Sequence, residues 1–285
     1  MRRALPGGAS ATAHTSRRLA TAIAATLTIL VVAGAAIVPA AGAGSHPRLL
    51  PDLVTLRVGQ GDLILKRSGK KLLLRLSNVI GNRGPGPLDI RPSGAPSDCD
   101  GDGDPANDRA TYQRIFRDSN ADKVFDRDQD SDSDDLLFGC ERFHPPHHHW
   151  HLLDFSRYKL VRERTGRTVV SSTKIGFCVI DTDHPFAGLP GSPPRGYYPA
   201  GSADCDRDSI DGLSVGWSDI YHYSLPGQKL NVTGLRHGRY CLVSTADPNN
   251  LLRESDNSNN AHRARIALHP GKRTVKRLQG RCRSR

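Results

Sequence analysis

The densest group of chemically active side chains is the run His144-Pro-Pro-His147-His148-His149-Trp150-His151, which holds five of the chain's twelve histidines. From Trp150 to Val161 the residues that follow are rich in β-formers, which predicts a strand. Residues two apart on a strand share a face. We therefore expect His147, His149 and His151 to lie on one side of it.

Three imidazoles on one face make a plausible metal site. Alternate positions on a strand are ~6.5–7 Å apart, a gap that imidazole side chains can close on one ion. Pro145 and Pro146 supply the bend that three ligands in a row require. Imidazole-rich sites suit copper, zinc, iron or nickel, and the Irving–Williams order favours copper(II). The alternative is a solvated histidine-rich loop that collects metal without using it.

Short β-like segments separated by Gly/Pro turns predict an all-β fold, an antiparallel β-sandwich with long loops. A turn cluster at residues 82–87 and a Pro-, Gly- and Ser-rich loop at 184–211 interrupt the pattern. The expected strands are residues 49–58, 62–66, 71–77, 88–90, 150–161, 168–172, 174–181, 220–223, 228–233, 240–245 and 261–268.

The first 43 residues read as a secretory signal peptide. Arginines precede an apolar run over residues 19–38, and Ala41-Gly42-Ala43 resembles a cleavage site. Export through either the general or the twin-arginine route would place residues 44–285 outside the cytoplasm as one domain. The alternative is an uncleaved membrane anchor.

Six cysteines in an exported protein predict disulfides, but they allow 15 pairings. Cys99 and Cys140 flank the acidic insert, residues 98–140, and are a candidate staple for it. Within residues 98–135 there are thirteen aspartates against five Lys or Arg, although the whole chain carries a net charge of +11.

The acidic insert contains two runs with oxygen ligands at alternating positions, the spacing that calcium prefers. Asp98 to Asp104 is the first. The second, Asp118 to Asp126, has EF-hand-like ligands but Lys123 at the sixth place and Gln129 at the twelfth. It is either a calcium-clasped loop or a solvated acidic loop.

The basic tail, residues 262–285, carries nine Lys or Arg and no acid. It is either a docking arm for anionic cell-surface polymers or a solvated terminus. No nucleic-acid-binding signature accompanies this charge, so we expect no nucleic-acid partner.

Taken in order, five segments resemble the lysyl oxidase family of secreted copper amine oxidases. The resemblance covers most of the chain after residue 43. The segments are Leu73-Leu74-Arg75-Leu76 with the Asn82-x-Gly84 turn and Arg91-Pro92; His147-x-His149-x-His151 with Asp154-Phe155-Ser156-x-Tyr158; Lys174-x-x-Phe177-Cys178-x-x-Asp181-Thr182; Gly212-Leu213-Ser214-x-Gly216-x-x-Asp219-x-Tyr221; and Pro248-Asn249 through Glu254-Ser255-Asp256-x-x-Asn259-Asn260.

This resemblance implies copper on His147, His149 and His151, and a lysine tyrosylquinone made from Lys174 and Tyr221. It implies oxidation of lysyl side chains or small primary amines by O₂ to aldehydes, with release of H₂O₂ and ammonia. Asp219 and Asp154 are candidate bases by proximity in sequence. Without the resemblance, Lys174 and Tyr221 would be ordinary strand residues.

The resemblance also implies a structural calcium site that ties the first strand to a late turn. Its ligands would be Asp52, the carbonyl of Leu53, Glu254, Asp256, Asn259 and Asn260. An Asx-rich turn without an ion is the alternative.

Two departures from the animal enzymes bear on the copper site. They have one more residue between the last copper histidine and the Asp-x-Phe-Ser element. His144 or His148 could therefore replace His147 as a ligand. Arg157 stands where the family has a histidine.

Two other function classes fit the same residues. One is a non-catalytic, calcium-stabilised β-sandwich whose histidines merely hold metal. The other is a zinc hydrolase that uses the three histidines and a water.

Overall fold

A computed structural model describes residues 46–145, 148–172, 175–198 and 210–282. The chain divides into two units, Met1–Gly44 and Ser45–Arg285. The predicted signal peptide falls in the first unit and lies outside the described residues. Among the described residues, no helix is long and apolar enough to cross a membrane.

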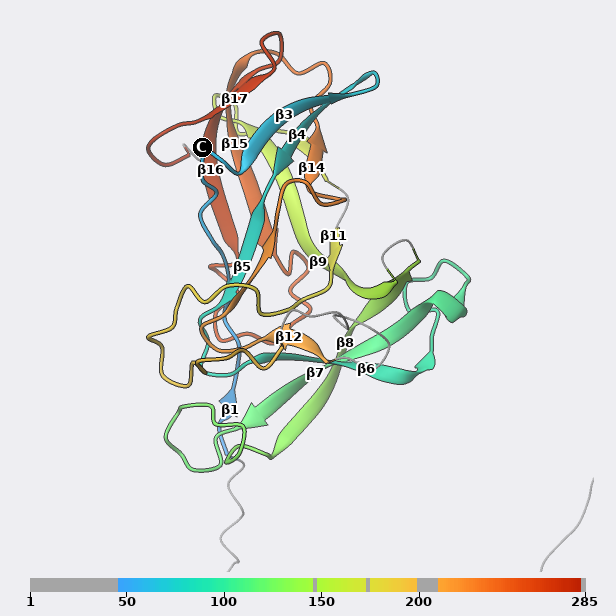
Figure 1. Cartoon of the computed structure of the whole chain (residues 1–285), viewed down its shortest axis with the longest axis vertical. Coiled ribbons are helices and arrows are strands. Elements are labelled where there is room, and N and C mark those ends of the chain that lie inside the picture. Colours follow the sequence, from blue (N-terminus) through green and yellow to red (C-terminus); the bar gives the residue numbers. More distant parts are fainter. Residues whose placement is uncertain (1–45, 146–147, 173–174, 199–209, 283–285) are drawn as a thin grey trace, which may run out of the picture. The chain divides into compact units, whose positions relative to one another are not determined.

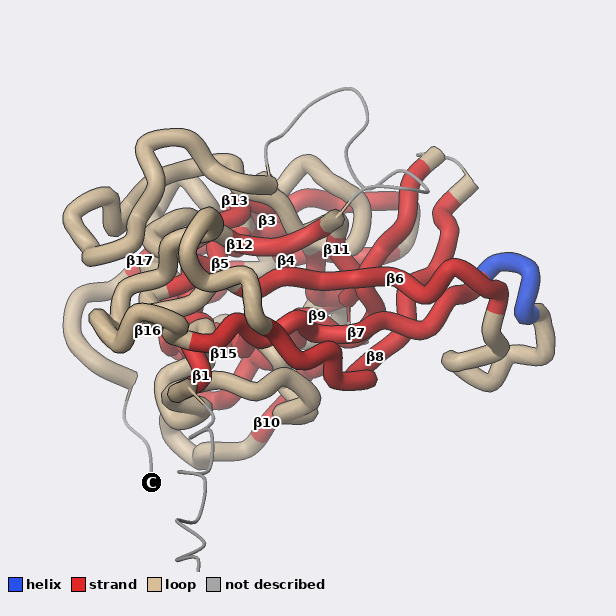
Figure 2. The backbone as a smooth tube through the Cα atoms, turned by 90° about the horizontal axis from the view of Figure 1, so that it is seen from below, coloured by secondary structure: helices blue, strands red, loops and turns tan. Residues whose placement is uncertain are grey.

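The described fold is all-β and every strand pair is antiparallel, which confirms the predicted fold class (Figure 1). One helical turn, η1 (Pro105–Asn107), interrupts the strands in the described part of the chain, beside β6 (Figure 2). Its first residue is a proline, which tolerates that position because the N–H it lacks would have no helical partner.

The largest sheet has eleven strands. Along its hydrogen-bonded path lie β12 (Asp211–Leu213), β6 (Leu88–Pro96), β7 (Asp108–Arg117), β8 (Ser133–His144), β9 (His149–Arg162), β15 (Gly238–Ala246), β16 (Ala261–His269) and β17 (Thr274–Arg277). Off this path, β1 (Arg48–Leu49) pairs with β7, and both β10 (Thr168–Ser171) and β11 (Ile175–Phe177) pair with β9.

Two three-stranded sheets form the opposite layer. The first has the order β13 (Ser218–Tyr221), β5 (Asn78–Asn82) and β2 (Leu53–Thr55). The second has the order β14 (Lys229–Asn231), β4 (Lys71–Leu76) and β3 (Leu63–Ser68). Together with the large sheet they make the two layers of a sandwich.

The core lies between these layers and follows the strand period. On β4, Leu72, Leu74 and Leu76 are buried while the residues between them are partly exposed. On β16, Ala264, Ile266 and Leu268 alternate in the same way. Because side chains two apart share a face, each strand contributes one apolar stripe, and these stripes form one cluster.

Strand β9 connects the core to the candidate site. Its second half pairs with β15 from Ser156 to Arg162, and its first half pairs with β8 from His149 to Leu152. Figure 1 shows it running from β8 and β7 toward β15 and β14. The histidine-rich end of β9 therefore lies beside β8, where the sheet leaves the sandwich core.

The sequence predicts no strand within the acidic insert, but the structure has two long strands there. Most of β7 and β8 lies inside it, and these strands form the longest paired ladder in the described part of the large sheet. Their inward positions include polar residues such as Thr111 and Gln113, both fully buried. An apolar alternation is therefore missing, which hides these strands from sequence analysis.

Disulfides are present, as predicted. Cys99 is bonded to Cys140 and Cys241 to Cys282. Cys178 is also disulfide-bonded. The first bond closes the acidic insert, and the second attaches the basic tail to β15.

Candidate functional site

The start of β9 brings two imidazole rings together, tilted by 42° to each other. His149 and His151 are two residues apart on the strand, and their Nε2 atoms are 2.9 Å from each other. Both side chains are partly buried. At this distance one Nε2 donates a hydrogen bond to the other, so both rings direct the same nitrogen toward one point. His147 lies outside the described residues.

A third imidazole comes from the end of β8. His144 is opposite His149 in the antiparallel register, and its ring stacks on that of His151 with centroids 5.0 Å apart. His148 is exposed and has a positive φ of 57°, in the turn between the strands. Of the two substitutes considered for His147, the structure brings His144 to the cluster.

The opposite face of this ladder is braced by a buried ion pair that sequence analysis missed. Arg109 on β7 donates from Nε to Glu141 Oε2 at 2.7 Å, and both side chains are almost fully buried. The guanidinium also lies over the Trp150 ring, 4.2 Å from its centroid. Trp150 in turn packs edge-on against Phe143. The sequence gives no signal for this brace because its partners come from three separate strands.

Strand β11 lies directly against the histidine strand. Phe177 is opposite Leu152, and Gly176 approaches β9 so closely that an added Cβ would be 2.9 Å from the Leu152 carbonyl oxygen and 3.3 Å from His151 Cβ. Only glycine fits at this distance. Lys174 directly precedes this strand and lies outside the described residues.

Tyr221, at the end of β13, meets the same segment from the other layer. Its hydroxyl donates to the carbonyl oxygen of Cys178 at 2.5 Å, and its ring contacts that of Phe177 with centroids 3.9 Å apart. Burial raises the pKa of the Tyr221 phenol well above its ordinary value, and the carboxyl of Asp219 adds to the rise.

Asp219 is two residues before Tyr221 on β13 and is almost fully buried. Burial raises its pKa well above the ordinary range, against the lowering effect of hydrogen bonds from the Ile180 backbone and Thr182. Its Oδ1 accepts a long hydrogen bond, 3.5 Å, from Thr182 Oγ1, while Oδ2 has no hydrogen-bond partner. Asp219 is thus a buried acid with a raised pKa, and its Oδ2 accepts no hydrogen bond.

Asp154 lies on β9 beyond the histidines and has a positive φ of 62°. Its Oδ2 accepts a hydrogen bond from Asn249 Nδ2 at 3.1 Å, and Asn249 Oδ1 accepts one from Arg157 at 3.1 Å. The carboxylate also lines a surface cavity of about 760 Å³ with Leu153 and Leu251. Asn249 was not among the predicted site residues.

The candidate calcium site joins residues from opposite ends of the described chain. Leu53 N donates to Glu254 Oε2 at 2.6 Å, and Asn259 Nδ2 donates to Asp52 Oδ1 at 2.8 Å. Asn260 Nδ2 donates to the other Glu254 oxygen at 2.7 Å. Five of the six predicted ligand residues therefore meet in one place.

The chemistry of these groups fits a hard cation. The Oδ1 atoms of Asn259 and Asn260 are buried and have no hydrogen-bond partner. Burial raises the pKa of Glu254 to about 7, and the nearby acids Asp247 and Asp52 add to the rise. Orphaned amide oxygens beside repelling carboxyls are what an oxygen-liganded ion would satisfy. Asp256, the sixth residue, is exposed and accepts a hydrogen bond from Ser258 N in its own turn.

Comparison of the sequence with known proteins matches about half of the chain to one family. Residues 139–277 match the sequence model of the family described as lysyl oxidase. This chain carries a lysyl oxidase family domain. The domain contains the histidine cluster, Tyr221 and the late acidic turn, whereas Asp52 and Leu53 precede the matched residues.

Named relatives come from several vertebrates. This chain is 32% identical to the pig and bovine proteins named protein-lysine 6-oxidase, over 125 residues that make up 44% of the chain. Human lysyl oxidase homolog 1 is 31% identical over the same length. The match spans 45% of the pig sequence, 27% of the bovine one and 20% of the human one. The chain thus covers less than half of these lysyl oxidase relatives.

Proposed function

We propose that this protein is a secreted copper amine oxidase that converts lysyl side chains or other primary amines to aldehydes with O₂. The organic cofactor would be a lysine tyrosylquinone formed from Lys174 and Tyr221. When present, that quinone takes two electrons from the amine and passes them to O₂, yielding ammonia and H₂O₂.

One observation carries the proposal: the histidine cluster and Tyr221 are linked by a short series of contacts. His151 packs against Gly176, the next residue Phe177 contacts the Tyr221 ring, and the Tyr221 hydroxyl bonds to the Cys178 carbonyl. Lys174 is adjacent in sequence to this segment. A metal-driven oxidation of a phenol requires the phenol near the metal.

The imidazoles fit copper by donor type and placement. Copper(II) favours imidazole nitrogen, and the rings of His144, His149 and His151 lie together. His147, whose placement is outside the described residues, remains a candidate ligand beside them. The buried ion pair of Arg109 and Glu141, on the opposite face, would hold in place the strands that carry these imidazoles.

Asp219 fits the role of a proton acceptor for the carbon-bound proton of the substrate. A raised pKa makes its carboxylate a stronger base than an exposed aspartate. Its unpartnered Oδ2 is available to take a proton. Asp154 is a second candidate, and its place beside an open cavity suits binding of a cationic amine.

The calcium site would be structural. It is held by Asp52, Leu53, Glu254, Asn259 and Asn260, and it would fix the chain before β2 to the turn before β16. Calcium there would neutralise the carboxyls of Asp52 and Glu254 and use the free amide oxygens.

The test is a search for the cross-link. Copper-loaded protein is digested and examined by mass spectrometry for a peptide that joins Lys174 to Tyr221, while H₂O₂ release from a primary amine is measured. Lys174→Ala and Tyr221→Phe should each remove the cross-link and reduce amine turnover to background.

The matched control is Tyr223→Phe, which removes a partly buried phenol two residues away and should preserve both signals. A wild-type protein with bound copper but no cross-link or turnover would contradict the proposal. Stoichiometric zinc without copper uptake would favour a zinc hydrolase instead.

A further inference from the structure

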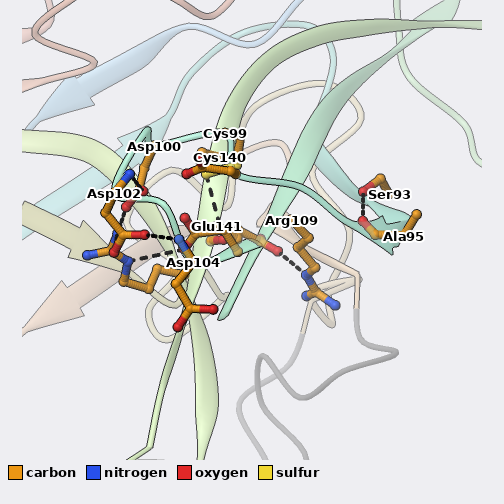
Figure 3. The surroundings of a disulfide bond; sticks show 12 residues. Ser93, Ala95, Cys99, Asp100, Asp102, Asp104, Arg109, Cys140 and Glu141 are labelled. Atoms are coloured by element: carbon orange, nitrogen blue, oxygen red, sulfur yellow. Dashed lines mark hydrogen bonds and ion pairs between the residues drawn. A yellow bond between two sulfur atoms is a disulfide. The ribbon is translucent and has the colours of Figure 1, made fainter. Parts of the chain in front are cut away.

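A loop near the histidine ladder gathers four carboxylates that the proposed oxidase chemistry does not use. We call residues 98–108 the acidic loop. Within it, one carboxylate oxygen from each of Asp98, Asp100, Asp102 and Asp108 lies within 4.8 Å of the others. The Cys99–Cys140 disulfide attaches the loop to β8, and Figure 3 shows Asp100 and Asp102 near this bond.

The charge of this cluster is not balanced by its neighbours. Arg142 on β8 is the single basic side chain among the described residues that contacts the four carboxylates, through Asp100, Asp102 and Asp108. One guanidinium against four carboxylates leaves a net charge of −3. Because every pair of these acids repels at such distances, the arrangement favours an additional cation.

A second observation points to a ligand and does not depend on the count of acids. The side chain of Asp108 is fully buried, and its Oδ2 has no hydrogen-bond partner although Oδ1 accepts from Arg142 Nε at 3.1 Å. A buried carboxylate oxygen without a donor is costly. The Asp108 carboxylate contributes one oxygen to the same close group as the three loop carboxylates.

The sequence of the acidic loop agrees with this arrangement. Asp98-x-Asp100-x-Asp102-Gly103 matches the first half of a calcium-loop pattern, in which glycine at the sixth place makes a sharp turn. Gly103 has the positive φ of 88° that this turn requires. The pattern's closing glutamate is absent, because Arg109 stands at the twelfth place. Asp108 would close the site from the eleventh.

We propose that the acidic loop binds one calcium ion, or an equally hard divalent cation, through Asp98, Asp100, Asp102 and Asp108. Oxygen-only ligands at alternating positions suit a hard ion with flexible geometry better than a transition metal. Arg142 would yield part of its contact to the ion. This site is separate from the family's calcium site, and the inference does not depend on the amine oxidase proposal.

The position of the acidic loop gives the ion a structural consequence. Asp108 is opposite Arg142 in the β7–β8 register, and Arg142 is opposite His151 in the β8–β9 register. Directly opposite residues in antiparallel strands point to the same face. The ion would therefore hold the edge of the ladder that carries His151, two strands away.

Calcium titration of the metal-free full-length protein by calorimetry tests the site. Wild type should bind one more equivalent of calcium than Asp108→Asn, or bind it at least tenfold more tightly. Glu254→Gln, which affects the other calcium site, should leave the acidic-loop equivalent in place. Hydrogen exchange should show new protection of residues 98–110 and 140–144 on calcium addition.

Asp100→Asn separates a loss of calcium binding from a folding defect, because it keeps the buried Asp108. It should still weaken the binding of the calcium ion at the acidic loop. Asp132→Asn, an exposed acid in the same insert but outside the cluster, should change nothing. Arg142→Gln should tighten calcium binding by removing the competing cation. If Asp100→Asn binds like wild type, or if Arg142→Gln only destabilises the fold without changing calcium affinity, the acidic loop is an ion-pair network and the proposal is wrong.

Discussion

Glu254 is a buried carboxyl at the centre of the proposed calcium site. It accepts hydrogen bonds from Leu53 N and Asn260 Nδ2, yet burial beside Asp247 and Asp52 still raises its pKa to about 7. Two donors do not offset the loss of water and the repulsion. In the calcium-free fold, Glu254 therefore keeps its proton to a higher pH than in the unfolded chain.

The pH dependence of stability follows from this shift. The ordinary pKa is 4.5 and the folded value is about 7, so the calcium-free fold is stabilised below the first value and loses stability as pH rises to the second. The loss is at most about 3 kcal/mol. Urea unfolding of calcium-free protein at pH 4.5 and pH 7.5 measures it.

Other acids with raised pKa values contribute to the same trend, so the comparison is made with Glu254→Gln. This variant should show a smaller loss between the two pH values. Calcium should restore the stability of wild type at pH 7.5 more than that of the variant. Identical pH profiles for the two proteins would show that Glu254 does not titrate as its surroundings imply.

Among the elements, β11 is short but contacts both layers of the sandwich near the candidate site. It is three residues long, yet it joins the histidine strand to the layer that holds Tyr221. Its close approach to β9 depends on Gly176 having no side chain. Strand β11 is thus fixed against β9 by backbone contact. A strand fixed in this way can hold the Tyr221 ring that packs against it in one position.

Gly176→Ala should separate β11 from β9. The new Cβ would be 2.9 Å from the Leu152 carbonyl oxygen, which a backbone atom cannot avoid without moving the strand. We expect a loss of about 1–3 kcal/mol in stability, with a larger proportional loss of amine turnover. Thermal unfolding and H₂O₂ release measure the two effects. Gly61→Ala, where an added Cβ meets nothing within 4 Å, is the control. Equal behaviour of both variants would contradict the close packing.

In the described part of the molecule, hydrogen bonds and disulfides connect residues that are far apart in the sequence. Asp52 and Leu53 bond to residues more than two hundred positions later, and Gln113 exchanges hydrogen bonds with the backbone of Arg253. Two disulfides add to these links, and each closes a separation of 41 residues. The disulfides stabilise the fold mainly by restricting the unfolded chain, whereas the hydrogen bonds act only in the folded state.

The Cys241–Cys282 bond provides a test of that contribution. For a separation of 41 residues, replacing both cysteines by serine should cost about 2–4 kcal/mol. The double variant avoids a free thiol. Chemical unfolding gives the change, and amine turnover should be preserved because the bond lies at the far end of β9 and β15 from the histidines. Unchanged stability would show that the basic tail is held by other contacts.

The amino-acid sequence predicts, without the structure, the all-β class, most strands of the sandwich core and the spacing of the histidines on β9. These features depend on local periodicity, which apolar side chains such as those of β4 display directly. It also identifies the candidate calcium ligands of the late acidic turn, because carboxylate and amide oxygens can be recognised from residue type alone.

The folded structure is needed to show which residues contact one another. It showed strands β7 and β8 inside the acidic insert, where buried Gln113 is satisfied by a backbone 140 residues away. It placed His144 on His151, Gly176 against β9 and Asp108 among the loop carboxylates. The physical reason is the same in each case. Register and long-range hydrogen bonding bring together side chains whose separation in sequence carries no periodic signal.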